Sequence, residues 1–575
     1  MSQPPAELDR PATGGDADPV AAPTAVRDGV DRSVGDPAPR GRATDAPGTV
    51  AEAAQRREDD NVLDYGTDDN HFEDDGQGGG LRGRVMRSGF WSTGGYVVQN
   101  IVRLGSNLIL SRLLLPDQFG LMVLVNIFMQ GLQMFSDVGI GPSIIHNKRG
   151  KEASFLDTAY TIQVVRGLAL FVVACGLAYP MAAVFETPEL FWAIPVAGLS
   201  AIVLGFTHTA LFTRNRDLDL SRITILQLIQ QGLMAGGMIA WALLISADFW
   251  ALLVPGIFAN LAYVVGTHVW LGGDKRRFRL DRSAAGELFS YGRWIFFSTL
   301  LTFVANQADR LIFGKLFDLT LLGIYGIGLM IAVLPREMIG KLGTYVIFPT
   351  YSKVRDDPER FGKIYKQVRL TILAAGALVT SIFIGIGEPL IRFMYTTPWH
   401  AAGWMLQLLA IGAWFQIMQA PNQAVLLALG KPNWMAAANA VKAVSLVIGV
   451  LAGYAWGTAQ VVDPQAADAW IYPFAGALGG VVVSDLLHYA VSALAVRVQK
   501  LPGLSVDPLM TLCVAVTSGA AWWVTHLVSA AWLGLVLGLL TLMAVWLPIV
   551  FWQLHRQRIS LRELTVSDLK RMVGR

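Results

Sequence analysis

Cysteine and charge are what this 575-residue sequence has least of. Its two cysteines, Cys175 and Cys513, each lie within an apolar run and far from any cluster of histidines. Such a pair predicts neither a disulfide framework nor a metal site. Charged residues make up 15% of the chain and hydrophobic residues 53%, which is more apolar surface than the interior of a soluble protein of this length can absorb. The composition therefore predicts a membrane protein.

The features of an enzyme are also missing. There is no glycine-rich phosphate loop and no Ser, His and Asp set of catalytic spacing. The longest loop expected on the outer side, about Thr458 to Ala469, offers only the carboxylates of Asp463 and Asp468. A polysaccharide polymerase or membrane glycosyltransferase normally needs a larger outer loop or domain, so we expect no enzymatic activity. No pattern predicts a cofactor or a nucleic-acid partner.

The N-terminal region differs from the rest of the chain. Residues 1–80 carry 7 Arg and 18 Asp or Glu, a net charge of −11, whereas the remainder carries +14. This region also has few large apolar residues, so it cannot bury enough surface to offset the entropy of ordering. We predict a disordered, acidic, cytoplasmic tail. No secretory signal is readable before the first apolar segment near Phe90, so we expect that segment to act as the insertion signal.

Beyond Ser88 the sequence predicts an all-α polytopic fold. We count about fourteen apolar segments long enough to cross a bilayer. They begin near Gly89, Gln118, Leu156, Leu190, Ile223, Phe249, Leu288, Leu321, Leu370, Gly403, Pro432, Trp470, Pro508 and Trp532. Every second connecting loop is rich in Lys and Arg, with examples at Lys148 and Arg149, Arg214 and Arg216, Arg276 and Arg277, and Lys366 and Arg369. Because basic loops stay in the cytoplasm, we expect both termini on the cytoplasmic side of a bacterial inner membrane.

Part of the sequence occurs twice. Gly89, Trp91, Arg112 and Gly120 return as Gly292, Trp294, Lys315 and Gly323, always 203 residues later. Such repeats in membrane proteins usually flank a central substrate path. We predict two pseudo-symmetric six-helix lobes, at residues 88–272 and 287–500, in parallel orientation because an even number of spans separates the copies. A cytoplasmic linker at 273–286 would join them, followed by two helices without counterpart at 505–555 and a cytoplasmic tail at 556–575.

Several short motifs are similar to those of a known family. They are Leu113–Leu121, Phe135–Ile145, Ala210–Arg216, Asp309 with Gly314 and Lys315, and Gly323 with Ile324 and Tyr325. In this order they resemble the polysaccharide transport family of the multidrug, oligosaccharidyl-lipid and polysaccharide exporter superfamily, over roughly residues 88 to 500. The resemblance implies a flippase that moves a polyprenyl-diphosphate-linked oligosaccharide from the cytoplasmic to the outer leaflet. The acidic tail departs from the family's usual short start.

Cations inside apolar helices are the main candidates for a binding site, because a charge in the membrane is costly and usually faces a cavity or a partner. A diphosphate headgroup needs several cations to offset its desolvation. Four residues meet this description and form the predicted cationic cavity: Arg103, Arg166, Arg336 and Lys442. Each of them can instead be neutralised by an internal acid or cap a helix, and this alternative stays open.

Other intramembrane polar residues are assigned secondary roles. Candidates for lining the cavity or for a polar clamp between helices are Gln99, Gln163, Asn306, Asp309, Arg310 and Glu337. For Asp309 and Arg310, next to Asn306, we favour the interhelical clamp. Asp485 and His488 lie one helical turn apart and are candidates for ion coupling.

Three rival functions were weighed against the flippase. A multidrug or cation antiporter of the same superfamily should favour acidic residues in its first-lobe cavity, but the first segment offers Arg103 and no carboxylate. A lipid II flippase would share the fourteen-helix form and a cationic cavity. A membrane-embedded polymerase is disfavoured by the small outer loops. The expected partners are the lipid-linked oligosaccharide and membrane lipid, together with a polysaccharide polymerase and co-polymerase, and we expect a monomer.

Overall fold

The computed structural model describes residues 81–137, 139–342, 351, 357–528 and 530–556. The predicted disordered tail at 1–80 and nearly all of the C-terminal tail at 556–575 lie outside these residues, so both stay predictions. Within the described ranges every regular element is a helix and no strand occurs. The predicted all-α membrane fold is therefore confirmed.

The first half of the helical region holds eight helices in the described ranges. They are α2 (Leu81–Leu113), α3 (Pro116–Phe135), α4 (Ile140–His146), α5 (Ala153–Val184), α6 (Leu190–Gly205), α7 (Ala210–Arg216), α8 (Ser221–Leu244) and α9 (Trp250–Val269). Local sequence explains several boundaries. Pro116 occupies the first turn of α3, where its missing N–H costs nothing. Gly139 precedes α4 with a φ of 69°, a left-handed conformation that favours glycine.

The second half is longer. Its α-helices are α10 (Arg282–Leu316), α11 (Leu319–Ala332), α12 (Leu334–Leu342), α14 (Pro358–Met394), α15 (Ala402–Ala428), α16 (Pro432–Ala459), α17 (Ile471–Val498), α18 (Asp507–His526) and α19 (Ala531–Arg556). Asp281, Asp318 and Asp357 each cap the helix that follows by accepting a backbone N–H of its first turn, as N-cap aspartates commonly do. Because Asp281 starts α10 at Arg282, the last five residues of the expected linker are helical.

Helices begin within three residues of eleven of the fourteen expected segment starts, whereas α2, α10 and α14 begin 8, 6 and 12 residues before the expected Gly89, Leu288 and Leu370. In the described residues, ten helices are long and apolar enough to cross a membrane, and the number is twelve if each of two bent pairs, α6 with α7 (63°) and α11 with α12 (42°), is one span. Helices α2 and α10, of 33 and 35 residues, cover the first and seventh segments. They are not among the twelve because polar residues such as Arg103 and Arg310 interrupt their apolar runs. The count of fourteen spans stays a prediction.

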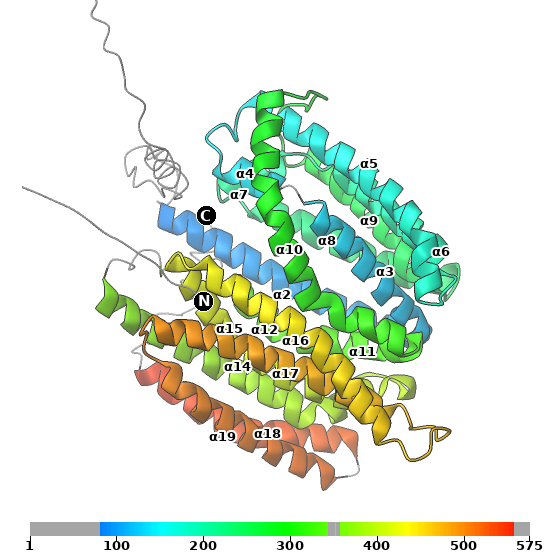
Figure 1. Cartoon of the computed structure of the whole chain (residues 1–575), viewed down its shortest axis with the longest axis vertical. Coiled ribbons are helices and arrows are strands. Elements are labelled where there is room, and N and C mark those ends of the chain that lie inside the picture. The colour runs from blue at the N-terminus through cyan, green and yellow to red at the C-terminus, as the bar shows by residue number, and fades with distance from the viewer. Residues whose placement is uncertain (1–80, 138, 343–350, 352–356, 529, 557–575) are drawn as a thin grey trace, which may run out of the picture. The chain divides into compact units, whose positions relative to one another are not determined.

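The two halves repeat the same packing, as pseudo-symmetric lobes require. Helix α2 packs against α8 as α10 packs against α16, and α5 packs against α6 as α14 packs against α15. The pair α8 and α9 likewise corresponds to α16 and α17. Helices α18 and α19 have no counterpart and pack against α14, along the lower edge in Figure 1. The predicted residue boundaries of the lobes stay predictions.

Helix α10 contacts both halves. Near its start, Ala284 and Leu288 pack into one apolar cluster with Ile144 of α4 and Phe155 of α5. Farther along, α10 packs against α3 and against α16 of the second half, and Figure 1 shows it running between the two groups of helices. The helix that opens the second copy of the repeat therefore connects the two halves.

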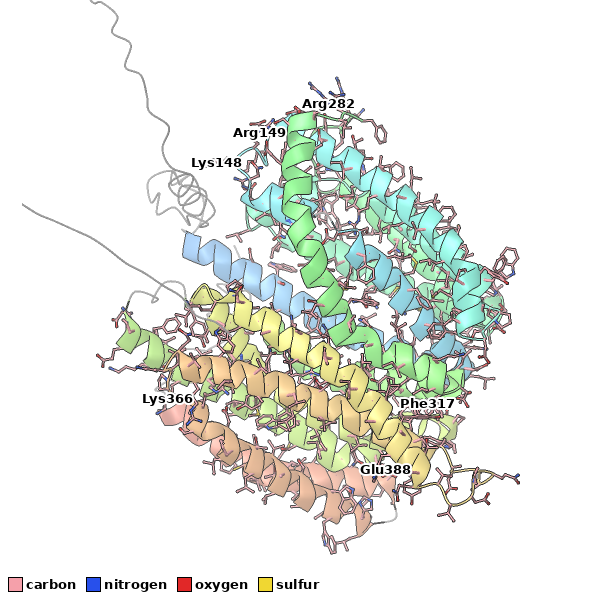
Figure 2. The ribbon with its side chains drawn as sticks, viewed as in Figure 1. Lys148, Arg149, Arg282, Phe317, Lys366 and Glu388 are labelled. Atoms are coloured by element: carbon pink, nitrogen blue, oxygen red, sulfur yellow. The ribbon has the colours of Figure 1, made fainter. Side chains whose placement is uncertain are left out.

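Basic residues gather at one end of the bundle. Figure 2 shows four of them at the upper and left ends of the helices: Lys148, Arg149, Arg282 and Lys366. Phe317 and Glu388 lie at the lower right, and we call the two ends the basic end and the opposite end. Arg369, expected with the basic loops, is instead buried in α14, with 1% of its side chain exposed, and pairs with Asp507. The burial reflects the long α14, which begins eleven residues earlier than Arg369.

The halves are joined closely at the opposite end. Trp399 donates its indole N–H to the carbonyl oxygen of Ser111 at 2.9 Å, and Lys315 Nζ lies 2.6 Å from Glu186 Oε1 in the loop after α5. The hydrogen bond from Lys315 lowers the pKa of Glu186. Helices α3 and α11 cross there, and a large apolar core shared by both halves surrounds the crossing. These contacts close the bundle at this end.

Candidate functional site

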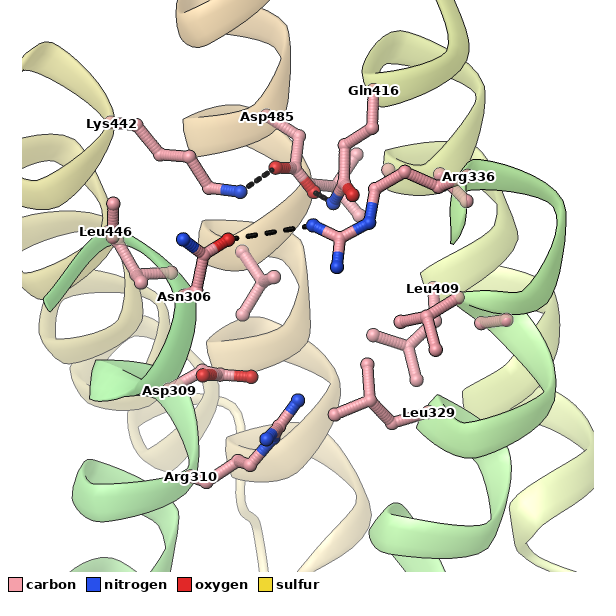
Figure 3. Close-up of a pocket in the computed structure, with 17 residues that line it drawn as sticks. Asn306, Asp309, Arg310, Leu329, Arg336, Leu409, Gln416, Lys442, Leu446 and Asp485 are labelled. Carbon is pink, nitrogen blue, oxygen red and sulfur yellow. Dashed lines mark hydrogen bonds and ion pairs between the residues drawn. The ribbon is translucent and has the colours of Figure 1, made fainter. Parts of the chain in front are cut away.

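A polar cavity lies within the second half of the bundle, between six helices. Its wall is formed by α10, α11, α12, α15, α16 and α17 (Figure 3). The polar lining consists of Asn306, Asp309, Arg310, Arg336, Gln416, Lys442 and Asp485. Leucines such as Leu329, Leu409 and Leu446 complete the wall. We call this space the central cavity.

Lys442 and Asp485 form an ion pair in the central cavity. Lys442 Nζ on α16 lies 2.8 Å from Asp485 Oδ1 on α17, and 8% and 2% of the two side chains are exposed. Gln416 on α15 donates its amide N–H to the other carboxylate oxygen at 2.7 Å. The structure thus joins a residue predicted to bind the diphosphate with one predicted for ion coupling. Lys442 is not a free cation, because an internal acid neutralises it.

Two arginines of the central cavity have no such acid. Arg336 on α12 donates to the side-chain oxygen of Asn306 at 3.5 Å, and Arg310 donates to Gln307 Oε1 at 2.5 Å. Among the described residues, neither guanidinium has a carboxylate oxygen within 4.0 Å. A cation in an apolar surrounding is costly until an anion accompanies it. The cavity therefore presents two arginines that can receive an anionic ligand.

Asp309 connects two helices, which is the geometry expected for a polar clamp. The hydroxyl of Tyr325 on α11 donates to the carboxylate of Asp309 on α10. Arg310, which the sequence analysis grouped with this clamp, has a different hydrogen-bond partner. Its partner Gln307 donates to Gln130 of α3 at 2.7 Å, so this pair of amides links Arg310 to the first half.

Arg166 and Gln163 line a second cavity, in the first half, together with Gln133, Asp137 and Tyr263. Arg166 donates to the hydroxyl of Ser136 at 2.8 Å and to the carbonyl oxygen of Gln133 at 2.6 Å. It therefore satisfies one carbonyl at the end of α3, a common role for a basic residue at a helix C-terminus. The structure does not bring Arg166 into the central cavity, where the sequence had grouped it with Arg336 and Lys442.

Gln163 supplies hydrogen-bond donors to the backbone at the break between α6 and α7. Its amide donates to the carbonyl oxygens of Gly205 and Thr207, both at 3.0 Å. These carbonyls lie where the bend interrupts the helical hydrogen bonds, so the side chain replaces the missing donors. The geometry gives Gln163 a structural task in addition to its place on the wall of the second cavity.

Helix α2 carries the predicted residues Gln99 and Arg103. Arg103 donates to Asn100 Oδ1 at 2.7 Å, and Ser106 and Asn107 donate to its backbone carbonyl. Gln99 lies on the same helix, half-buried. Neither Gln99 nor Arg103 lines the central cavity or the cavity of the first half. These two residues are therefore separate from the cations that the structure groups together.

Two other predicted residues also lie outside the central cavity. Glu337 on α12 accepts a hydrogen bond from the hydroxyl of Tyr96 on α2, which joins the two halves. His488 lies one turn beyond Asp485, with its Nε2 3.2 Å from Gln419 Nε2. Neither residue lines the cavity wall.

Sequence reasoning missed four residues of this region: Tyr96, Gln307, Tyr325 and Gln416. Each is an uncharged polar residue within an expected helix, and the candidates were chosen mainly among charged residues and their near neighbours. Their signal was a tyrosine or glutamine amid an apolar run, which usually marks a hydrogen bond between helices. In the described ranges no group of His, Cys, Asp and Glu is arranged to hold a metal ion.

The fold is that of a class of membrane transporters. The structure of "Lipid II flippase MurJ, inward closed conformation" aligns with a TM-score of 0.61 and 13% identity, covering 81% of this chain and 98% of that one. An inward-facing multidrug resistance MATE family transporter of the MOP superfamily aligns with a TM-score of 0.56 and 12% identity, covering 70% and 95%. At these identities the likeness shows the fold alone.

The family follows from the sequence. Residues 109–403, just over half of the chain, match the family described as "Polysaccharide biosynthesis protein", and the chain belongs to it. The resemblance inferred from the motifs is thus confirmed. The chain is 24% identical over 331 residues to the amylovoran biosynthesis protein AmsL of Erwinia amylovora, covering 56% of this chain and 82% of the relative. It is 22% identical over 384 residues to the lipopolysaccharide biosynthesis protein WzxC of Escherichia coli K12, covering 65% and 76%.

Proposed function

We propose that this multi-pass membrane protein is a flippase of polysaccharide biosynthesis. It moves a polyprenyl-diphosphate-linked oligosaccharide across the bacterial inner membrane by alternating access, with the diphosphate bound in the central cavity. Family membership supports the pathway, and a relative from Rhizobium meliloti, 23% identical over 309 residues, is a succinoglycan biosynthesis transport protein. The role is transport and not catalysis. The lipid tail stays in the bilayer while the sugar occupies water.

This proposal is carried by Arg310 and Arg336, two cavity arginines that have no carboxylate at ion-pair distance in the part of the chain that the structure describes. Each guanidinium offers several N–H donors in a planar fork that matches phosphate oxygens. They lie on α10 and α12, on different sides of the cavity in Figure 3, so a diphosphate between them would contact both helices. The sequence placed Arg103, Arg166 and Lys442 in the same role; for these three it stays a proposal with weaker geometric support.

The charge of the central cavity disfavours a multidrug or cation antiporter. Its lining includes three cations, Arg310, Arg336 and Lys442, and two carboxylates, Asp309 and Asp485. A site for cationic drugs would need the opposite balance. A lipid II flippase would use the same cations, because its substrate carries the same diphosphate. The relatives in lipopolysaccharide and amylovoran biosynthesis favour a polysaccharide precursor.

The proposal extends to topology and partners. The basic end faces the cytoplasm, which puts both termini there. The closed opposite end then faces outward, so the structure corresponds to the state before substrate release. We further propose that the flippase works as a monomer and delivers its substrate to a polysaccharide polymerase with its co-polymerase.

The test is the leaflet distribution of polyprenyl-linked sugar after depletion of the protein, with secreted polysaccharide measured in parallel. We expect loss of the polymer, with lipid-linked units retained on the cytoplasmic leaflet. Complementation with Arg310→Gln or Arg336→Gln should lower export on the order of tenfold, because each loses a charge-assisted hydrogen bond to phosphate. Arg392→Gln is the matched control, since Arg392 pairs with Glu388 at the opposite end. Normal delivery of lipid-linked units to the outer leaflet after depletion would overturn the proposal.

A further inference from the structure

Among the described residues that line the central cavity, Lys442 and Asp485 form the one ion pair. Both side chains are more than nine-tenths buried, and both lie beside the arginines that have no acid. A carboxylate next to a proposed anion site is unfavourable for an anionic ligand, because like charges at short range repel. A cavity built only for tight binding of a diphosphate would not contain Asp485. Its presence therefore needs a reason other than affinity.

The chemistry of the pair supports exchange of partners. Lysine has a flexible stem and three rotatable donors, unlike the planar fork of arginine. Lys442 can therefore turn from one acceptor to another, whereas Arg336 and Arg310 are held by Asn306 and Gln307. Asp485 has a second donor in Gln416. Its carboxylate consequently keeps a hydrogen bond when Lys442 turns away.

Without a ligand, the pair also keeps the cavity stable. A buried charge that loses its partner is strongly destabilising, so Lys442 needs an anion in every state of the transport cycle. Asp485 supplies that anion while the cavity is empty. A diphosphate can supply it while the cavity is occupied.

We propose that Asp485 is an internal counter-ion that competes with the substrate for Lys442. The diphosphate forms an ion pair with Lys442 when it enters the cavity. Asp485 pairs with Lys442 again when the substrate leaves, and this lowers the free-energy barrier to release. Asp485 is thus a positioning residue for transport, acting through Lys442. This inference rests on the proposed function.

The experiment measures binding and release of farnesyl diphosphate by the full chain in lipid nanodiscs, with farnesol as the probe that lacks the headgroup. Asp485→Asn removes the competitor and leaves Lys442 free for the diphosphate. If Asp485 occupies Lys442 about nine-tenths of the time, removing it tightens binding about tenfold. The dissociation rate should fall by a similar factor, and the export rate at saturating substrate should fall with it. Asp463→Asn, in the exposed loop between α16 and α17, is the matched control and should change none of these values.

A merely structural role of Asp485 predicts a different pattern, with lower thermal stability and unchanged or weaker probe binding. Equal or weaker binding by a folded Asp485→Asn variant would overturn the proposal. If that variant does not fold, Gln416→Leu is measured instead, because it keeps the ion pair and removes the second donor of Asp485. Asp485 then depends on Lys442 alone and competes more strongly, so binding of farnesyl diphosphate should weaken while binding of farnesol does not change. Unchanged diphosphate binding by this variant overturns the proposal.

Failure of this inference is distinguishable from failure of the proposed function. If the wild-type protein binds farnesyl diphosphate no better than farnesol, the diphosphate site itself is wrong. If it prefers the diphosphate and loses that preference in Arg336→Gln, but Asp485→Asn binds like the wild type, then only the role of Asp485 is wrong.

Discussion

Gly120 and Gly323, equivalent residues of the sequence repeat, lie against each other where α3 crosses α11. A Cβ on Gly323 would lie 2.9 Å from the backbone nitrogen of Gly120. A Cβ on Gly120 would lie 1.9 Å from the carbonyl oxygen of Leu319, and one on Gly323 1.9 Å from that of Pro116. Pro116 and Leu319 are again 203 residues apart. The contact is reciprocal, as around a two-fold axis, so the pseudo-symmetry axis passes through this crossing.

Replacing either glycine should force the crossing apart. Gly120→Ala or Gly323→Ala places a methyl group inside a backbone carbonyl, and overpacking in a tight contact costs about 1–3 kcal/mol or more. We expect a lower thermal unfolding temperature in detergent and strongly reduced polysaccharide export. The matched control is Gly236→Ala in α8, where an added Cβ meets no atom within 4 Å. A wild-type unfolding temperature for Gly120→Ala would show that the helices do not cross this closely.

The contact between Tyr96 and Glu337 predicts a conformational effect. Tyr96→Phe removes the hydroxyl that α2 donates to α12 while keeping the ring. If the halves separate on this side during transport, the substitution favours the separated state. A cysteine reporter on the cavity wall, Leu329→Cys in a background without Cys175 and Cys513, should then react faster with a water-soluble maleimide. An unchanged labelling rate would mean that the hydrogen bond does not hold the two halves together.

The buried pair Arg369 and Asp507 predicts a large effect on stability. Arg369 Nη2 lies 2.5 Å from Asp507 Oδ2, with 1% and 4% of the side chains exposed, and the hydroxyl of Tyr489 also donates to Asp507. This ion pair links the start of α18 to α14. Removing one partner leaves a buried charge, so Asp507→Asn should destabilise by about 3–5 kcal/mol. Thermal unfolding followed by a thiol-reactive dye measures this loss. Lys363→Gln, whose partner Glu359 is exposed, should show almost none.

Gln307 predicts an effect on substrate affinity. It accepts from Arg310 and donates to Gln130 on α3, so it orients a cavity arginine from the other half. Gln307→Leu should weaken binding of farnesyl diphosphate several-fold, because Arg310 loses its orientation but not its charge. Gln307→Glu, which keeps the acceptor, should retain the orientation yet pair with Arg310 and also weaken binding. Wild-type affinity in both variants would exclude Arg310 from the site.

Much of the fold could be predicted from the sequence, because the length and apolarity of a segment are local properties. The expected start at Gln118 lies close to Pro116, the first residue of α3. Helices α10 and α14 begin at Arg282 and Pro358, before the expected Leu288 and Leu370, because their first turns are polar. The repeat indicated two similar halves before any contact was known. The bends between α6 and α7 and between α11 and α12 were not foreseen. A bend depends on which side chains, such as Gln163, satisfy the interrupted backbone.

The candidate site was only partly predictable. Arg336, Lys442 and Asp485 were recognised as intramembrane charges, and the structure brings them together. It was not evident from the sequence that Asp485 neutralises Lys442, which lies 43 residues earlier, or that Arg166 caps α3. These contacts depend on how each helix is rotated about its own axis, and this rotation is not a local property of the sequence.

Hydropathy and repetition are properties of residue order, so the residues alone were enough to predict an all-α membrane protein of two related halves. Which charges meet could not be predicted in this way, because the rotation and tilt of a membrane helix are set by packing against its neighbours. Through that packing, Arg310 and Arg336 face the central cavity without a carboxylate at ion-pair distance among the described residues. Gly120 and Gly323 gained their role in the same way, since only the crossing of α3 and α11 leaves no room for a side chain.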